Sequence, residues 1–150
     1  MNGLRSLSVL LCAAALSSCG EKSAQDITGP LASARIKFFN FGVNAPGVNF
    51  YANTTKMTAI SSTSGTESVT GTVYGSVGSG GFYSAIAPGQ YIFSGTIAAA
   101  TDKDLAIAKV TTAIVDGKSY SLYLSGFYDA TAKTVDGFVL EDAYPATIDY

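Results

Sequence analysis

Two cysteines, Cys12 and Cys19, carry the most reactive side chains of this 150-residue sequence, which contains no histidine. A catalytic thiol needs a neighbouring base, usually an imidazole, so catalysis by cysteine finds no support here. Serine triads and histidine-ligated zinc sites are excluded for the same reason. Cys12 lies inside an apolar run, residues 7–16, which follows Arg5 and has the composition of an export signal. Cleavage of that signal removes Cys12, so the mature chain keeps a single cysteine and no internal disulfide is expected.

Cys19 ends the stretch Leu-Ser-Ser-Cys, residues 16–19, where the apolar run stops. A run of about ten apolar residues is too short to cross a bilayer, which requires about 20. The stretch is similar to the bacterial lipobox, whose cysteine is diacylated (with palmitate-like chains) and becomes the N-terminus after cleavage. We therefore predict a lipoprotein signal peptide over residues 1–18 and a lipidated Cys19 that attaches the protein to the lipid bilayer. An ordinary secretory signal with an incidental Cys19 is the alternative.

Residues 19–33 are small and polar and include Gly29-Pro30, which is typical of a flexible tether. Gly20 follows the predicted anchor, whereas an aspartate at this position retains enterobacterial lipoproteins in the inner membrane. We therefore expect an exported bacterial protein, lipid-anchored in the cell envelope at the outer membrane.

The acidic residues give little support for catalysis or metal binding. Most lie at predicted turns, where an aspartate hydrogen-bonds its own backbone; these are Asp102, Asp104, Asp116, Asp129 and Asp136. Glu141 and Asp142 lack the spacing of a calcium-binding loop. The glycine-rich residues 74–83 lack the lysine and hydroxyl residue of a phosphate-binding loop. We therefore expect no enzyme activity, no catalytic residue, no metal and no cofactor.

Tyrosines are the remaining candidates for a binding function. Five lie on strand faces opposite the apolar set or near strand ends: Tyr51, Tyr74, Tyr83, Tyr123 and Tyr128. Gathered and exposed, they would form a rigid stacking surface for sugars or peptides. Alternatively, they shield the outer face of a sheet or pack on a neighbouring domain. Tryptophan offers the largest stacking face for a sugar, and the sequence has none. Its absence weakens the argument for carbohydrate binding.

These side chains must be positioned by strands. Hydrophobic residues make up 47% of the chain and charged residues 13%, with 9 Tyr, 8 Phe and 16 Gly, a composition that favours strands and turns. Apolar residues alternate with polar ones at residues 48–53, 68–77, 90–97 and 119–126, the period of half-buried antiparallel strands. Residues 34–41 are less clearly patterned, and Phe39 with Phe41 suggests that both faces are covered there. Turn signals, among them Pro88-Gly89 and Asp116-Gly117, separate these runs. We predict an all-β, antiparallel β-sandwich of seven to nine short strands over residues 34–142, after a cleaved signal.

Several stretches of this domain resemble a bacterial lipoprotein family known as domain of unknown function 4397. They are ARIKFFNFGVNAPGVNFYANTTK, YSAIAPGQYIF, VDGKSYSLYLSG and VDGFVLED, and together they span about residues 34–142. The resemblance implies an immunoglobulin-like or transthyretin-like β-sandwich with no established activity and no site residues to carry over. Members often hold tandem copies, and LEDAYPATIDY resembles the junction between two copies. Residues 143–150 are therefore expected to be a tail or the start of a linker to a further copy. The sequence is either a single-domain member or, as we expect, an N-terminal piece of a longer chain.

The formal net charge of −2 and the lack of a basic cluster argue against nucleic acid as a partner. The sequence thus predicts a membrane-anchored cell-envelope lipoprotein with a non-catalytic β-sandwich and a structural or protein-binding role. Its partners would be the bilayer, through acylated Cys19, and another copy of the domain or an envelope protein. The alternative is a carbohydrate-binding accessory lipoprotein that holds a glycan on exposed tyrosines.

Overall fold

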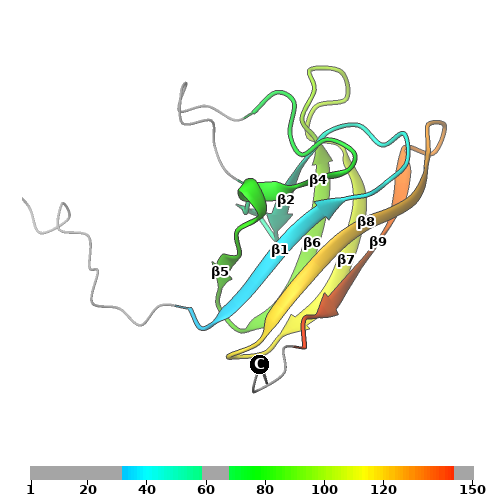
Figure 1. Ribbon diagram of the computed structural model, residues 1–150. Coiled ribbons are helices and arrows are strands. Elements are labelled where there is room, and N and C mark those ends of the chain that lie inside the picture. Colours follow the sequence, from blue (N-terminus) through cyan, green and yellow to red (C-terminus); the bar gives the residue numbers. More distant parts are fainter. Residues whose placement is uncertain (1–31, 59–67, 144–150) are drawn as a thin grey trace, which may run out of the picture. The chain divides into compact units, whose positions relative to one another are not determined.

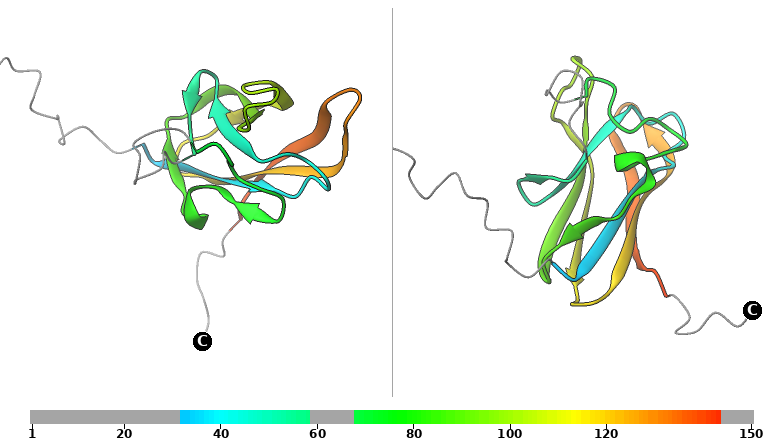
Figure 2. Two further views of the ribbon diagram at one scale, coloured as in Figure 1. Left: turned by 90° about the horizontal axis from the view of Figure 1, so that it is seen from above. Right: turned by 60° about the vertical axis from the view of Figure 1, so that its left-hand side comes forward.

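The structure is a computed structural model that describes residues 32–58 and 68–143. The predicted signal peptide, Cys19, the tether up to residue 31 and the tail 144–150 lie outside these ranges. Within the described ranges the chain forms nine β-strands and one short 3-10 turn, η2 (Gly78–Gly81). The strands build two sheets that face each other as the layers of a sandwich (Figures 1 and 2). The predicted all-β sandwich is confirmed, and its architecture is consistent with an immunoglobulin-like fold.

The first sheet has the order β4-β1-β8-β9, and β5 also pairs with β1. Its strands are β1 (Ala34–Asn40), β4 (Ser76–Val77), β5 (Ser84–Ile86), β8 (Ser119–Asp129) and β9 (Thr134–Glu141). All its pairings are antiparallel except that of β1 with β8, which is parallel. This pairing departs from the predicted antiparallel pattern. It arises because the chain passes through the whole second sheet between these two strands, and such a long crossover lets two strands run in the same direction.

The second sheet is antiparallel throughout, with the order β3-β2-β6-β7. Its strands are β2 (Val48–Ala52), β3 (Thr55–Lys56), β6 (Gly89–Ile97) and β7 (Ala106–Ile114). At one side of the sandwich the two sheets come close together. Gly137 of β9 lies there against Val110 of β7, and a Cβ at the glycine would stand 3.1 Å from the valine Cγ2. The inner face of β9 is therefore covered by β7.

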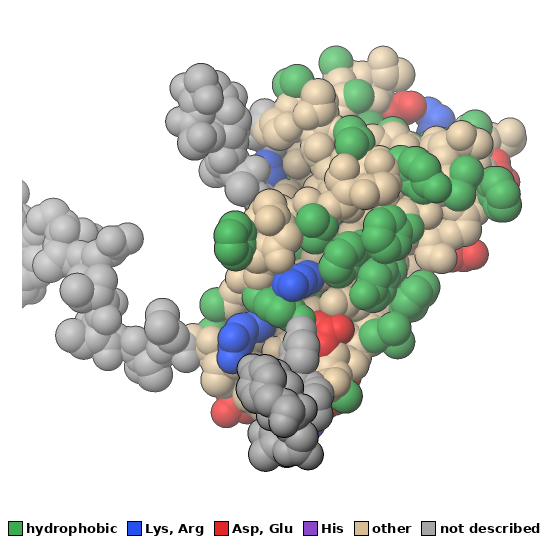
Figure 3. Space-filling model, in the orientation of Figure 1, with side chains coloured by type: hydrophobic (Ala, Val, Ile, Leu, Met, Phe, Trp, Pro, Cys, Tyr) green, Lys and Arg blue, Asp and Glu red, His purple; other side chains and the backbone are tan. Residues whose placement is uncertain are grey.

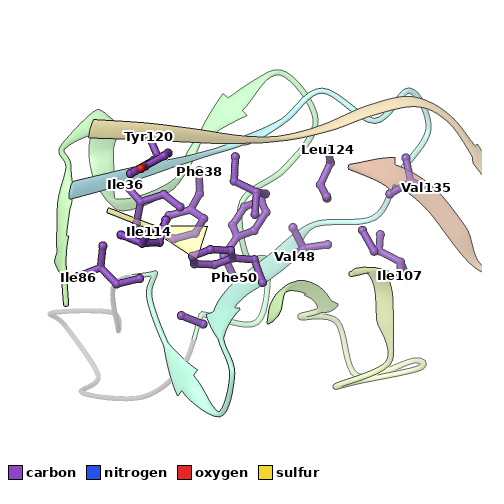
Figure 4. Close-up of a cluster of buried hydrophobic side chains, with 14 of the residues drawn as sticks. Ile36, Phe38, Val48, Phe50, Ile86, Ile107, Ile114, Tyr120, Leu124 and Val135 are labelled. Carbon is purple, nitrogen blue, oxygen red and sulfur yellow. The ribbon is translucent and has the colours of Figure 1, made fainter. Parts of the chain in front are cut away.

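The core fills the space between the sheets with alternate side chains from each strand (Figure 4). Phe38 of β1 stacks on Phe50 of β2, with ring centroids 5.1 Å apart, and so joins the two sheets. The alternation predicted at residues 48–53, 90–97 and 119–126 is confirmed in β2, β6 and β8; Phe50, Phe93 and Leu122, for example, are at most 1% exposed. β1 alternates more regularly than expected, since Ala34, Ile36, Phe38 and Asn40 are buried and the residues between them face outward.

Asn40 is a buried polar residue at the end of β1, with 0% of its surface exposed. Its Nδ2 donates hydrogen bonds to the carbonyl oxygens of Pro46 (3.2 Å) and Thr72 (2.9 Å). Its Oδ1 accepts a hydrogen bond from the backbone N–H of Gly42 at 3.2 Å. One amide therefore joins the loop that follows β1 to a loop more than thirty positions later in the sequence.

The strand predicted over residues 68–77 is wrong: only Ser76 and Val77 form a strand, β4. Two valines of the apolar set in that alternation are exposed, Val69 by 74% and Val73 by 48%, whereas Thr72 of the polar set is buried. Gly71 and Gly75 break the extended backbone with φ angles of +58° and +76°, a region that side-chain-bearing residues rarely occupy. Thr72 instead forms an isolated bridge to Val48, with one backbone hydrogen bond in each direction.

Candidate functional site

The outer face of the first sheet, turned away from the core, carries an unusual number of large apolar side chains. Strand alternation sends every second residue of β1, β8 and β9 to this face. We call the resulting surface the apolar face, and its members are Phe39, Phe41, Tyr123, Phe138 and Leu140. Figure 3 shows hydrophobic side chains gathered over these three strands. Phe41, Phe138 and Leu140 are 44%, 42% and 53% exposed.

Strand register explains how three of these rings come together. Phe39 of β1 pairs with Tyr123 of β8, and Tyr123 pairs with Phe138 of β9. The Phe39 and Tyr123 ring centroids are 4.7 Å apart at an interplanar angle of 11°, and those of Tyr123 and Phe138 are 5.3 Å apart at 26°. Phe41 joins the group at tilted angles, 5.6 Å from Phe39 and 6.0 Å from Tyr123. The result is a continuous aromatic row across three strands.

The row is a stack of rings and not a flat platform. Two near-parallel rings whose centroids are 4.7 Å apart must overlap face to face, because rings lying side by side in one plane would collide at that separation. The Tyr123 ring has such a neighbour on each side, so both of its faces are covered. At its centre the surface therefore offers the edge of the Tyr123 ring to a ligand, with the aliphatic side chain of Leu140 on the same face.

A polar cluster lies next to the apolar face. The Tyr83 hydroxyl and the Ser121 hydroxyl both donate to Asp142 Oδ2, each at 2.9 Å. The Lys37 ammonium lies over the Tyr83 ring, 4.2 Å from its centroid, a cation–π contact. We call these four side chains the polar bridge, because they connect residues that come just before β5, from β1, from β8 and from just after β9.

The structure separates the five tyrosines predicted as a binding patch. Tyr123 is the centre of the aromatic row and Tyr83 belongs to the polar bridge beside it. Tyr51 lies in β2, on the outer side of the second sheet, and Tyr74 is a 56% exposed loop residue. Tyr128 is half-buried and packs against the core. Of the five, Tyr123 therefore belongs to the apolar face and Tyr83 borders it, and the other three do not contribute to it.

Sequence reasoning missed the phenylalanines and Leu140 as members of this surface. A regular alternation in residues 34–41 and again in 134–141 was the signal that could have found them. From the sequence, Phe39 and Phe41 suggest that both faces of this strand are covered. The structure shows that both side chains lie on one face, the outer one.

The acidic residues behave as turn and surface groups. Asp129 Oδ1 accepts hydrogen bonds from the backbone N–H groups of Thr131 and Ala132, both at 2.8 Å. The bond from Ala132, and then that from Thr131, lowers the pKa of Asp129 below its ordinary value. Glu141 forms an ion pair with Lys118 at 2.7 Å, and the hydrogen bond to this carboxylate raises the lysine pKa. Among the described residues, no group of three or more acidic or cysteine side chains is placed to hold a metal ion.

Comparison with known proteins finds no family model and no curated protein that matches this chain. The resemblance to domain of unknown function 4397 therefore stays a prediction. Across residues 32–58 and 68–143, no helix is long and apolar enough to span a membrane.

Proposed function

We propose that this chain is a lipoprotein of the bacterial cell envelope, anchored through acylated Cys19, whose β-sandwich binds a protein partner and catalyses no reaction. The Leu-Ser-Ser-Cys sequence at residues 16–19 supports the anchor, and export to the outer membrane follows from the signal and from Gly20. The observation that carries the binding role is the apolar face. A contiguous group of five large apolar side chains on the outside of a sheet is the kind of surface that proteins use for docking.

The stacking geometry favours a protein over a glycan as the partner. A sugar ring binds aromatic residues through an open ring face, whereas the central ring of this row, Tyr123, is covered on both faces. Ring edges and aliphatic groups suit the interdigitated packing of a protein interface, which is rich in aromatic residues at its centre. A glycan held on exposed tyrosines remains the alternative function and is included in the test.

The anchor is tested by the substitution Cys19→Ala in the full chain. We expect the variant to move from the membrane fraction to the soluble fraction, because it loses its acyl chains. Protease treatment of intact cells then separates two locations, since a domain on the outer surface is digested and a periplasmic one survives. A Cys19→Ala variant that stays in the membrane fraction would contradict the anchor.

The binding role is tested by chemical cross-linking in cells that express the full-length chain. Phe138→Ser should abolish cross-linked protein complexes, because it removes one end of the aromatic row. Ile92→Ser is the matched control, since Ile92 is 50% exposed on β6 of the second sheet. Equal loss in both variants, or complexes unchanged in both, would count against the apolar face. Binding to a purified glycan without any protein complex would favour the alternative function.

A further inference from the structure

We propose that the protein partner docks as an extended strand on the free edge of β9, an inference that rests on the proposed protein-binding function. β9 ends the first sheet, and among the described residues no strand pairs with its outer side (Figure 1). It has 8 residues, whereas β4 and β5, at the opposite end of the sheet, have 2 and 3. A long strand with one unpaired side is a template for pairing with another chain.

The register of β8 with β9 shows which backbone groups point to this edge. The Asp142 N–H donates to the carbonyl of Ser119, the residue opposite it, so these two form a hydrogen-bonded pair. Hydrogen-bonded and non-hydrogen-bonded pairs alternate along an antiparallel ladder, so Leu140 and Phe138 also turn their N–H and C=O groups to β8. The residues that turn these groups to the free edge are Gly137, Val139 and Glu141. Within residues 32–58 and 68–143 their outward groups form no backbone hydrogen bond, and a strand laid beside β9 would pair with them.

The aromatic row ends at this edge with an open ring face. The centroids of successive rings are 4.7 Å and 5.3 Å apart, close to the distance of about 4.8 Å between neighbouring strands. The rings therefore stack across the sheet, one ring from each strand. Phe138 stacks on Tyr123 with one face, its other face is turned beyond β9, and the side chain is 42% exposed. An aromatic residue opposite Phe138 on an added strand would continue the row by one ring.

The neighbours of Phe138 on the same face define the rest of the partner segment. Asp136 lies two residues before it and Leu140 two residues after it, and strand alternation places all three side chains on the outer face. An added antiparallel strand therefore fits best with an aliphatic residue opposite Leu140, an aromatic residue opposite Phe138 and a basic residue opposite Asp136. A second copy of β9 fits less well, because it would place Asp136 opposite Leu140 when Phe138 faces its own copy.

The other long strand at a sheet end is a poorer docking edge. β7 ends the second sheet, but its exposed residues include Lys109, and a lysine on an edge strand discourages pairing with another chain. β9 contains neither lysine nor proline. A row of peptide groups beside apolar side chains is the recognition mode in which main-chain hydrogen bonds supply affinity and alternate side chains supply specificity. The edge of β9 therefore suits an extended peptide segment.

The first test uses the Cys19→Ala form of the full-length chain and the synthetic peptide acetyl-Thr-Val-Thr-Phe-Thr-Lys-Thr-amide, which has the expected order of side chains. Amide hydrogen exchange measured by NMR reports the pairing directly. In the free chain the Phe138 N–H should exchange slowly, and the Gly137 and Val139 N–H groups should exchange fast. At about ten times the Kd of the peptide, exchange at Gly137 and Val139 should slow about tenfold, because only the unbound fraction exchanges.

The control peptide carries N-methyl groups on the two threonines beside the phenylalanine. It keeps every side chain and loses the N–H groups that would donate to β9, so it should give no protection. Equal protection by the control peptide overturns the inference, as does a lack of protection by the unmodified peptide.

The second test applies proline substitutions to the in-cell cross-linking of the full-length chain. Val139→Pro removes an N–H that points to the free edge, a change that an edge strand tolerates, and should lose the cross-linked complexes. Val139→Ala also shortens the side chain but keeps the N–H, so it should retain more of them. Glu141→Pro and Glu141→Ala repeat the comparison at the exposed end of β9, where a proline disturbs the fold least.

The outcomes separate this inference from the proposed function. Phe138-dependent complexes that survive in both proline variants overturn docking at the edge and leave the binding function standing. Equal losses in the proline and alanine variants at both positions also overturn docking at the edge. If the wild-type chain forms no complex, the function and the inference are both overturned. Cross-linking of two copies of the chain to each other through β9, without a different protein, assigns the edge to a second copy and overturns the inference.

Discussion

Replacement of Asn40 by alanine tests whether a single buried amide fixes the loops at the end of the first sheet. The substitution removes all three hydrogen bonds of this fully buried side chain. The Thr72 carbonyl keeps a second donor, the Val48 N–H at 3.1 Å, and the Pro46 carbonyl lies in a part-buried bond, so the buried group that loses its partner is the Gly42 N–H. At roughly 1–3 kcal/mol for a buried unsatisfied group, we expect Asn40→Ala to destabilise the domain by about 1–3 kcal/mol.

A loss of this size is a large share of the 5–15 kcal/mol that typical domains possess. Urea unfolding followed by far-UV circular dichroism measures it, because the midpoint should fall while the slope stays constant. The control is Gln90→Ala, which removes an exposed amide from β6 and should cost less than about 0.5 kcal/mol. A loss below about 1 kcal/mol for Asn40→Ala would refute the reasoning, since water would then be replacing the amide at no cost.

Three further substitutions test the core, a turn and a titrating group. Leu122→Ala should lower the free energy of unfolding by roughly 2–5 kcal/mol, because the side chain is 1% exposed in the core; a negligible loss in urea unfolding would mean that its packing is misassigned. Gly117→Val should lower the melting temperature, whereas Gly117→Asn should be better tolerated, because the glycine φ is +71° with no crowding near a Cβ; equal melting of both variants would contradict a backbone cause. Asp129→Ala should reduce the loss of stability in acid. The pKa of Asp129 is lower in the folded protein than its ordinary value of about 3.9, so the charged carboxylate stabilises the fold above that ordinary value. This contribution disappears as the pH falls through the pKa of the folded state. Urea midpoints of wild type and variant at about pH 6 and pH 3 measure this, and an identical acid response in both chains would contradict it.

The sequence predicts inward-facing residues well where a strand is continuous. Phe50, Phe93 and Leu122 follow a period of two that depends only on the extended backbone, so their burial could be predicted. The prediction from alternation fails at residues 68–77. Two glycines with positive φ change the direction of the chain there without changing the alternation of valines. Local pattern carries no information about such a break when glycine is also acceptable in a strand.

The candidate site was predictable only in part, because it depends on which strands pair. Tyr123 stood out as an aromatic residue on a polar strand face, but its stacking partners come from β1 and β9. Phe39 lies more than eighty positions before Tyr123 in the sequence, and only the parallel register of β1 with β8 brings the two rings together. Long-range register follows from the whole set of strand pairings, so no short stretch of sequence contains it.

The parallel pairing of β1 with β8 also constrains the order in which the domain folds. Near this pairing Ser33 and Gly117, 84 positions apart, are joined by a hydrogen bond, and contacts between such distant positions slow folding because a long loop must close first. Among the strands that the structure describes, β1 is the first to leave a ribosome or a translocation pore, yet its central partner, β8, is the second-last to follow. The first sheet cannot be completed until nearly all of the domain has emerged. For a chain exported N-terminus first, as we propose here, this delay would keep the polypeptide unfolded during transfer and let the sandwich close on the far side of the membrane.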